Sequence, residues 1–374
     1  MRVLYFTRDY TPHDYRFLAA LAETQHQVFY LRLERRGQQL EDRPLPPQIE
    51  QVTWSGGRAP ARLQDAPRLL AGLRRVIRKV KPDLTHAGPI QTSALLAALS
   101  GFRPLVSMSW GSDLLRDASR SAAYRWATRY TLARSDALIV DCEPVRQKAL
   151  EFGMPEQKIV SFPWGVDLEH FSPANGRPAL FDSERQDSGE RTFTLLSTRG
   201  WEPIYGVDVI ARAFVQAARQ RPGLRLIMLG GGSQAALLHE IFTRGGVQER
   251  VLLPGQVSQD DLPRYYRASD LYVSASHSDG TSISLLEAMA SGTPCLVSDI
   301  PGNREWVEPE VQGWWFPDGD AGALAQTVLT ALQTPDRLAQ MGRAARRTAE
   351  QRADWEHNFR KLLQAYEMAR RAQR

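Results

Sequence analysis

Cysteine is scarce in this sequence, with only Cys142 and Cys295 among 374 residues. The two lie far apart, each beside an apolar run, so two buried thiols are favoured over a disulfide. No Cys and His residues cluster with the spacing of a metal site. A disulfide-stapled fold is therefore excluded, and we expect no bound metal.

Long apolar runs are also missing. No uninterrupted stretch of about 18 apolar residues occurs, so no transmembrane helix is predicted. The opening residues, MRVLYFTRDY, pass from a short apolar strand directly to polar residues, without the longer apolar region of a signal peptide. We therefore expect a cytoplasmic protein, either free or at the inner face of the membrane.

The composition is that of a globular protein, with 43% hydrophobic and 24% charged residues and a net charge of +5. The length suggests about two domains. Basic residues gather in 68–83 and in the C-terminal MARRAQR, which indicates either solvated helix faces or a surface for an anionic membrane. No aromatic-interleaved basic platform accompanies them, so no nucleic-acid partner is expected.

Short apolar runs alternate with helical patterns along almost the whole chain, from RVLYF (2–6) to TPCLVSD (293–299). This alternation is typical of parallel sheets with helical crossovers, so we predict an α/β protein with two doubly wound, Rossmann-like domains. The pattern lapses in a segment rich in Pro, Gly, Ser and charge. The expected parts are an N-terminal domain at 1–170, a linker at 171–191, a C-terminal domain at 192–354 and a closing helix at 355–374.

The stretch HSDGTSISLLEAMASGTPCLVSD (277–299) combines two carboxylates, Asp279 and Glu287, with the signals of a helix start. A helix that begins near Ser282 presents unpaired N–H groups and a partial positive charge, which favour phosphate. Gly292 suits the end of that helix. Spacing alone leaves Glu287 undecided between facing ribose hydroxyls and lying exposed in solvent. The residues expected at a ligand in this turn are Gly280, Thr281, Ser282 and Ile283.

Ligands of doubly wound sheets bind beyond the carboxyl ends of the strands. In the C-terminal half, those positions hold one cation, Arg199, and a glycine cluster at 230–232. Neither half has a good G-x-G-x-x-G after its first strand, which argues against a dinucleotide oxidoreductase. The arrangement favours a phosphate-bearing ligand in the C-terminal half.

With these residues in view, the chain resembles a family 4 glycosyltransferase of the GT-B fold over essentially its whole length. DGTSISLLEAMASGTPCLVSD matches the family pattern E-G-x-x-x-x-L-L-E-A-M-A-x-G-x-P-V, with Asp279 in place of the first glutamate. GVDLEHFSP (165–173), STRGWEPIYGVDVIARAF (197–214) and LIMLGGGS (226–233) resemble further family segments. The resemblance implies two Rossmann-like domains that face each other across a cleft, with the closing helix crossing back to the N-terminal domain.

The resemblance also implies roles for single residues. Glu287 matches the glutamate that holds the donor's ribose, and Asp279, shorter by one methylene, matches the one that contacts the transferred sugar. Arg199 matches the arginine that neutralises the diphosphate, whereas Tyr205 stands where the family has a lysine. Tyrosine is uncharged at neutral pH, so more of the diphosphate charge would fall on Arg199, the helix start and the glycine loop. The remaining donor contacts implied are Gly231 and Gly232, with Gln256, Val257 and Ser258 near the base.

The N-terminal half resembles the family less closely. TRDYTPHD replaces the glycine-rich loop after the first strand, and Trp110 stands where the family often has a histidine. No catalytic histidine is therefore carried over. His13 and His86 either line the cleft or serve as polar loop and packing residues. Asp113 either contacts acceptor or sugar, or caps the helix that follows it.

The resemblance implies a retaining glycosyltransferase that moves a sugar from a nucleotide-diphosphate sugar to a hydroxyl on a glycan, a lipid-linked or a small-molecule acceptor. Front-side attack would need no protein general base, and no cofactor is expected beyond the nucleotide sugar as co-substrate. Two alternatives stay open, since fold alone does not determine function. One is a nucleotide-sugar epimerase or hydrolase of the same fold. The other is a non-catalytic, nucleotide-sugar-binding partner subunit.

Overall fold

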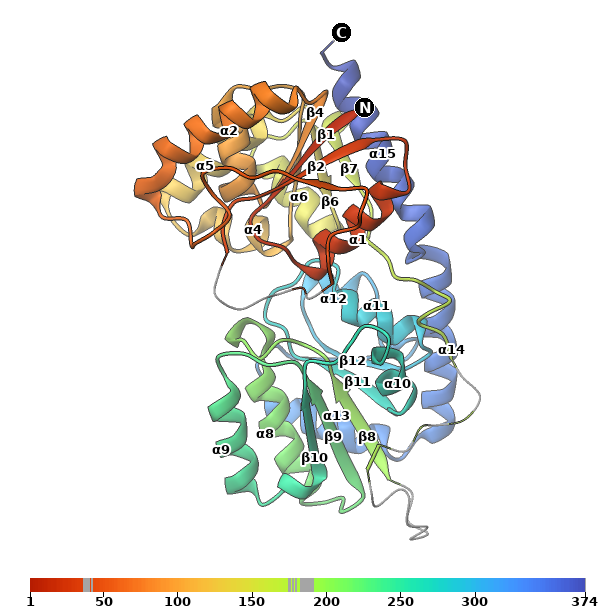
Figure 1. Ribbon diagram of the computed structural model, residues 1–374. Coiled ribbons are helices and arrows are strands. Elements are labelled where there is room, and N and C mark those ends of the chain that lie inside the picture. The colour runs from red at the N-terminus through yellow and green to blue at the C-terminus, as the bar shows by residue number, and fades with distance from the viewer. Residues whose placement is uncertain are drawn as a thin grey trace. The chain divides into compact units, whose positions relative to one another are not determined.

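The computed structural model describes residues 1–35, 41, 43–173, 176, 178, 180–181 and 192–373. The chain divides into two compact units (Figure 1). Unit 1 consists of Met1–Pro163 and His357–Arg374, and unit 2 consists of Trp164–Glu356. The predicted linker, 171–191, lies mostly outside the described residues.

Unit 1 is built on a seven-stranded sheet in the order β3-β2-β1-β4-β5-β6-β7, in which neighbouring strands run parallel. The chain winds from β1 outward to β3 and then returns to β4 on the other side of β1. The point at which the order reverses, where such sheets bind ligands, therefore lies between the ends of β1 and β4. The strands are β1 (Arg2–Thr7), β2 (Gln27–Arg32), β3 (Glu50–Gln51), β4 (Leu84–Gly88), β5 (Leu105–Met108), β6 (Ala137–Val140) and β7 (Ile159–Ser161).

The first strand and helix show how the sequence forms these elements. Val3, Leu4 and Phe6 are fully buried, as expected of a central parallel strand that helices cover on both faces. The helix α1 begins with a capping box, because Thr11 and Asp14 each bond the other's backbone N–H. The helices of unit 1 are α1 (Pro12–Ala22), α2 (Ala66–Val80), α3 (Leu95–Ser100), α4 (Ser112–Leu115), α5 (Ala122–Arg134), α6 (Glu143–Glu151) and α15 (Trp355–Arg371), with shorter turns η1 (Leu63–Asp65), η2 (Ile90–Ala94), η3 (Asp117–Ser119) and η4 (Glu156–Lys158).

From His357 onward, the closing helix α15 belongs to unit 1, as the resemblance implied. Leu362 and Tyr366 lie on its buried side. The Tyr366 hydroxyl is 2.8 Å from Nδ1 of His86, within β4. This buried polar contact joins the last helix of the chain to the centre of the first sheet.

Unit 2 contains a six-stranded parallel sheet in the order β10-β9-β8-β11-β12-β13. Its order reverses between β8 and β11, which are adjacent at the centre of the sheet. The strands are β8 (Phe193–Ser197), β9 (Leu224–Leu229), β10 (Val251–Gly255), β11 (Leu271–Ser274), β12 (Cys295–Ser298) and β13 (Gly313–Phe316). The helices are α8 (Val207–Ala218), α9 (Ala235–Gly245), α10 (Leu262–Arg267), α11 (Ile283–Ala290), α12 (Pro301–Arg304), α13 (Ala321–Ala331) and α14 (Pro335–Arg352), with shorter turns η5 (Pro203–Tyr205) and η6 (Gln248–Arg250).

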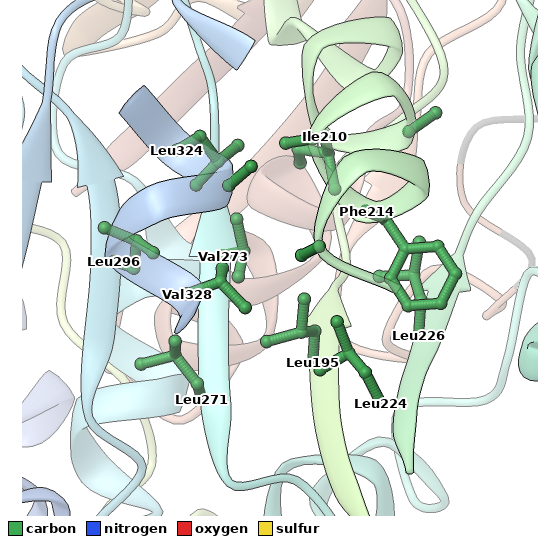
Figure 2. Packing of buried hydrophobic residues seen from close by; sticks show 14 of the residues in the cluster. Leu195, Ile210, Phe214, Leu224, Leu226, Leu271, Val273, Leu296, Leu324 and Val328 are labelled. Carbon is green, nitrogen blue, oxygen red and sulfur yellow. The ribbon is translucent and has the colours of Figure 1, made fainter. Parts of the chain in front are cut away.

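Two helices, α8 and α13, cover one face of this sheet. Figure 2 shows Ile210 and Phe214 of α8 and Leu324 and Val328 of α13 directed at the strands. Each fully buried side chain of this size contributes about 1.5–3 kcal/mol relative to leaving it exposed. The strand residues that complete the contact in Figure 2 are Leu195, Leu224, Leu226, Leu271, Val273 and Leu296.

The two parallel, doubly wound sheets confirm the predicted fold class. Cys142 and Cys295 are both buried and neither forms a disulfide, as expected. Two strands were missed by the sequence reading. β3 has only two residues, and β13 is an edge strand whose residues GWWF lack the aliphatic character of the other runs.

Candidate functional site

The loops that follow β8 and β11 lie against each other at the switch point of unit 2. Parallel neighbouring strands end at the same edge of a sheet, so their following loops are brought together. Gly206, at the end of the first loop, approaches the backbone of Ala275 so closely that a Cβ would lie 2.1 Å from its carbonyl oxygen. Its φ of +57° also favours glycine. This approach lets α8 start directly beside β11.

Arg199 joins these two loops. Its Nη1 donates to the hydroxyls of Ser282, at 2.9 Å, and Ser284, at 3.2 Å. Its Nη2 lies 2.7 Å from Oδ2 of Asp279. Burial by itself lowers the pKa of Arg199, but Asp279 is the largest of the neighbours that raise it, and the net change is upward. The guanidinium is therefore a persistent cation at the start of α11.

Tyr205 lies beside this cation. Its ring centre is 4.2 Å from the guanidinium carbon of Arg199, which is the geometry of a cation–π contact. The residue ends the short turn η5, just before α8. Tyr205 therefore faces the same guanidinium that Asp279 pairs with, and it packs against the hydrophobic core beneath it.

The carboxylates of Asp279 and Glu287 both lie largely buried in this site. The side chain of Asp279 is 20% exposed, and burial raises the pKa of its carboxyl, while Arg199 partly offsets the increase. Glu287 is only 7% exposed, so the exposed, solvated position considered for it is wrong. Its Oε2 accepts a 2.9 Å hydrogen bond from the hydroxyl of Tyr266. The carboxylates are thus held by different partners, one by a cation and one by a phenol.

The start of α11 is as expected from the sequence. The helix begins at Ile283 with Ser282 at its N-cap, and Gly292 follows its end with a φ of +73°. Gly280 and Thr281 are buried in the turn that leads into it. Arg199 reaches this N-terminus through Ser282 and Ser284, so a cation and a helix N-terminus converge on one region.

The glycine loop after β9 adjoins the loop that carries Arg199. The Gly231 carbonyl accepts a 2.9 Å hydrogen bond from the N–H of Trp201. A Cβ on Gly232 would lie 2.5 Å from the Trp201 carbonyl oxygen, so the close approach requires glycine. The structure therefore brings Gly231 and Gly232 beside the Arg199 loop.

The residues expected near the base lie further along the sheet. Val257 and Ser258 follow β10, an edge strand separated from β8 by β9. Val257 packs against the core, and the Ser258 hydroxyl donates to Asp261 at 2.7 Å. The neighbouring Gln256 is exposed. Their contact with a nucleotide base remains a prediction.

In unit 1, the structure brings together His13 and Trp110. His13 lies on α1 and Trp110 follows β5, and their ring centres are 5.4 Å apart. A Cβ on Gly88, at the end of β4, would lie 2.9 Å from Nε1 of Trp110. The two aromatic rings thus lie near the switch point of the first sheet.

Asp113 accepts hydrogen bonds from the loops around it. Oδ2 accepts a hydrogen bond from the Ile90 N–H, and Oδ1 accepts bonds from the Ser109 hydroxyl and the Trp110 and Leu114 N–H groups. Asp113 lies inside α4, whose N-cap is Gly111, so the predicted role as a cap of the following helix is wrong. Its four bonds within the chain instead tie the backbone of Ile90 to the loop and first turn around Asp113. Burial raises its pKa, and these bonds act in the opposite direction.

His86 is a packing residue. It is 1% exposed within β4, lies edge-on to Tyr5, and is bonded to Tyr366. Burial lowers the pKa of the imidazole to about 3. His86 is therefore a neutral core residue, and the alternative in which it lines a cleft is wrong.

Three residues at the switch point of unit 2 were not predicted: Thr198, Tyr266 and Tyr272. The Tyr266 hydroxyl contacts Thr198 at 3.0 Å, and its single hydrogen is shared between two acceptors, the Ser284 carbonyl and Glu287. The Tyr272 hydroxyl donates to Ser284 at 2.9 Å. The available signal was chemical, since a tyrosine in a buried run needs a polar partner for its hydroxyl.

Within the described part of the chain, no group of three or more His, Cys, Asp and Glu side chains could hold a metal ion. The sequence has an Asp-x-Asp at Asp318-Gly319-Asp320, and its carboxylates have other partners. Asp318 bonds His277 at 2.6 Å, and Asp320 accepts from the Ala323 N–H at the start of α13. Among the same described residues, no helix is both long and apolar enough to cross a membrane.

Comparison with known proteins places the chain in a family. Residues 13–170 match the model of Glycosyltransferase Family 4, and residues 180–348 match that of Glycosyl transferases group 1. The chain belongs to the family 4 glycosyltransferases. This membership confirms the resemblance found in the sequence. Arg199, Asp279 and Glu287 all lie within residues 180–348, which match the group 1 model.

Curated relatives of this family 4 chain are glycosyltransferases by name. D-inositol 3-phosphate glycosyltransferase of Salinispora tropica is 32% identical over 215 residues, which are 54% of this chain and 44% of the relative. A GDP-mannose-dependent alpha-(1-6)-phosphatidylinositol monomannoside mannosyltransferase of Mycolicibacterium smegmatis is 26% identical over 312 residues, which are 82% and 73% of the two chains. The chain spans about half the length of the first of these relatives.

Solved structures share the fold of the family 4 chain over nearly its whole length. Anabaena Alr3699/HepE in complex with UDP-glucose has a TM-score of 0.78 at 19% identity, covering 98% of this chain and 99% of that one. Sucrose-phosphate synthase of Thermosynechococcus elongatus also has a TM-score of 0.78 at 19% identity, with 98% of each chain covered. At this identity, the likeness establishes the fold.

Proposed function

We propose that the protein is a glycosyltransferase that moves a sugar from a nucleotide-diphosphate sugar to an acceptor hydroxyl. The observation that carries this proposal is the convergence of Arg199, the N-terminus of α11 and two carboxylates at the switch point of unit 2. A cation and unpaired helix N–H groups suit a diphosphate, and carboxylates suit the hydroxyls of two sugars.

In this proposal, the diphosphate binds Arg199, the first-turn N–H groups of α11, and the loop of Gly231 and Gly232. These donors are preorganised, because Arg199 is tied to the helix start by two serine hydroxyls. They would support the negative charge that develops on the departing phosphate, which is a large contribution in catalysis. Tyr205 would take part by holding the guanidinium in place.

The two carboxylates would act on different sugars. Glu287 would accept hydrogen bonds from the donor's ribose, with Tyr266 fixing its orientation. Asp279 would accept them from the transferred sugar. Val257 and Ser258 would lie near the base, as the family resemblance implies. The pair would thus clamp the donor, and neither carboxylate is assigned as general acid or base.

Transfer would retain the configuration at the anomeric carbon. The acceptor oxygen attacks that carbon on the face from which the diphosphate departs, the bond from carbon to the phosphate oxygen breaks, and the acceptor proton passes to the leaving phosphate. No protein base is required for this sequence. Besides the acceptor, the proposed step uses only the nucleotide sugar.

The acceptor is proposed to bind unit 1, where His13 and Trp110 meet near the switch point. A polyol phosphate is the first acceptor to try, because the named relatives include an inositol 3-phosphate glycosyltransferase. A lipid-linked acceptor in the cytoplasm would suit the exposed basic side chains of α2, which are Arg68, Arg74, Arg75, Arg78 and Lys79. Binding to vesicles that contain anionic lipid, compared with neutral vesicles, tests that extension.

The proposal is tested by incubating the purified protein with UDP-glucose and GDP-mannose, with and without inositol 3-phosphate or a short glycan. Formation of a glycoside together with nucleoside diphosphate supports it. An epimerised nucleotide sugar, or rapid release of free sugar without acceptor, favours an epimerase or hydrolase instead. Binding of a nucleotide sugar without turnover on any acceptor favours a partner subunit.

A further inference from the structure

The charges at the Arg199 guanidinium already cancel within this chain. Nη2 pairs with the Asp279 carboxylate at 2.7 Å, while Nη1 donates to the uncharged hydroxyls of Ser282 and Ser284. The Tyr205 ring beside it is also uncharged. A doubly charged diphosphate that arrives here therefore meets a cation whose charge one carboxylate has already neutralised.

The Asp279 carboxylate has other partners that would remain if Arg199 turned to a second anion. It also accepts hydrogen bonds from the Gly280 N–H and the Ser282 hydroxyl. Oδ2, the oxygen that pairs with Arg199, is buried, whereas the Asp279 side chain as a whole is 20% exposed. The remaining hydrogen bonds matter, because separating a buried ion pair is costly when one charge is left without hydrogen bonds.

We propose that Asp279 is a counterion that the donor's diphosphate replaces on Arg199, and that this replacement frees the carboxylate to accept hydrogen bonds from the transferred sugar. The inference rests on the proposed function, because it takes Arg199 as the diphosphate ligand. Phosphate oxygens offer guanidinium the same charge-assisted hydrogen bonds as a carboxylate. The exchange therefore keeps the buried cation paired in both states.

Because of this exchange, the site recognises the diphosphate and the sugar of one ligand together. A nucleotide sugar takes Arg199 from Asp279 and supplies sugar hydroxyls to the carboxylate in return. A nucleoside diphosphate takes Arg199 but supplies no hydroxyl donor to Asp279. The site consequently holds the donor more tightly than the nucleoside diphosphate product, which favours product release after transfer.

The test is calorimetric titration of the whole chain with UDP and with GDP. Asp279→Asn removes the competing charge but keeps the side-chain shape, so the variant should bind the better of the two at least about tenfold tighter than wild type. Affinity for the corresponding nucleotide sugar should rise less, because the variant loses a hydroxyl acceptor. An unchanged or weaker affinity for the nucleoside diphosphate would overturn the inference.

Two further variants keep the test decisive. Glu240→Gln breaks an exposed Glu240–Arg244 pair of 2.9 Å on α9 and should leave both affinities unchanged. Tyr205→Lys adds a second cation and retains Asp279, so it should also tighten nucleoside diphosphate binding. If Asp279→Asn does not fold, this variant provides the test, and unchanged affinity in it counts against the inference. Absence of nucleotide binding in every variant and in wild type would refute the proposed function itself, whereas wild-type binding without these gains would refute the exchange alone.

Discussion

The guanidinium carbon of Arg199 lies 4.2 Å from the ring centre of Tyr205, in the geometry of a cation–π contact. The Tyr205 ring therefore gives this cation an uncharged surface to pack against. An aromatic ring fixes the position of a guanidinium without competing for its hydrogen-bond donors. Three predictions concern this contact and the residues around it, and a fourth concerns His86 in the core of unit 1.

Tyr205→Ala should lower kcat/KM for glycosyl transfer by roughly threefold to thirtyfold, because a cation–π contact contributes about 0.5–2 kcal/mol. Tyr205→Phe keeps the ring and should remain within about twofold of wild type. Steady-state kinetics with varied nucleotide sugar measure both. An equal loss in the two variants would show that the hydroxyl, and not the ring, is what matters.

Glu287→Ala should lower kcat/KM for the nucleotide sugar by about ten- to a hundredfold, because hydrogen bonds to a charged group contribute about 1.5–3 kcal/mol. The protein should remain folded by circular dichroism. Glu240→Ala, on the exposed face of α9, is the matched control and should leave turnover unchanged. Near-normal turnover of Glu287→Ala would remove this carboxylate from the site.

Tyr266→Phe should raise KM for the nucleotide sugar more than it lowers kcat. Its hydroxyl bonds Glu287 and contacts Thr198, so its loss frees the carboxylate to change orientation without removing it. The loss of stability should be about 1–3 kcal/mol, since the Ser284 carbonyl and Glu287 both lose a donor. Kinetics and thermal unfolding are compared, and a loss of stability with unchanged KM would mean that the hydroxyl acts in folding alone.

The stability of unit 1 should depend on the protonation of His86. Burial lowers its pKa to about 3 in the folded protein, whereas the unfolded chain binds a proton below about pH 6.5. Between these values, acidification favours the unfolded state, so lowering the pH from about 7.5 to about 5 should cost about 2 kcal/mol. His86→Gln cannot be protonated and should lack this component.

Asp14 acts in the opposite direction over the same range. Burial raises its folded pKa to about 7, so it stabilises the folded state as the pH falls below that value. Because Asp14 is present in both proteins, the difference between wild type and His86→Gln isolates the histidine. Native-state hydrogen exchange in β4, corrected for intrinsic rates, measures it. A difference that does not change with pH would contradict the neutral, buried histidine.

Much of the fold followed from the order of apolar runs. Buried parallel strands are apolar on both faces, so runs such as RVLYF and ALIV are visible without any knowledge of the partner strand. β13 was not visible in this way, because its residues GWWF are a glycine and three aromatics, which do not form an aliphatic run even though most of them are buried. The helix start at Ser282 was visible, since its turn residues signal it locally.

The sequence by itself determined the two alternating α/β halves, the position of α11 and, through its motifs, the family. Only the tertiary structure decided that Glu287 is buried against Tyr266, that Asp279 and Tyr205 meet at Arg199, and that His86 belongs to the core. Local patterns depend on neighbours three or four positions away, and these can be read along the chain. The partners of a buried polar group come from strands and helices far apart in sequence, so their distances and burial exist only after the sheet has brought them together.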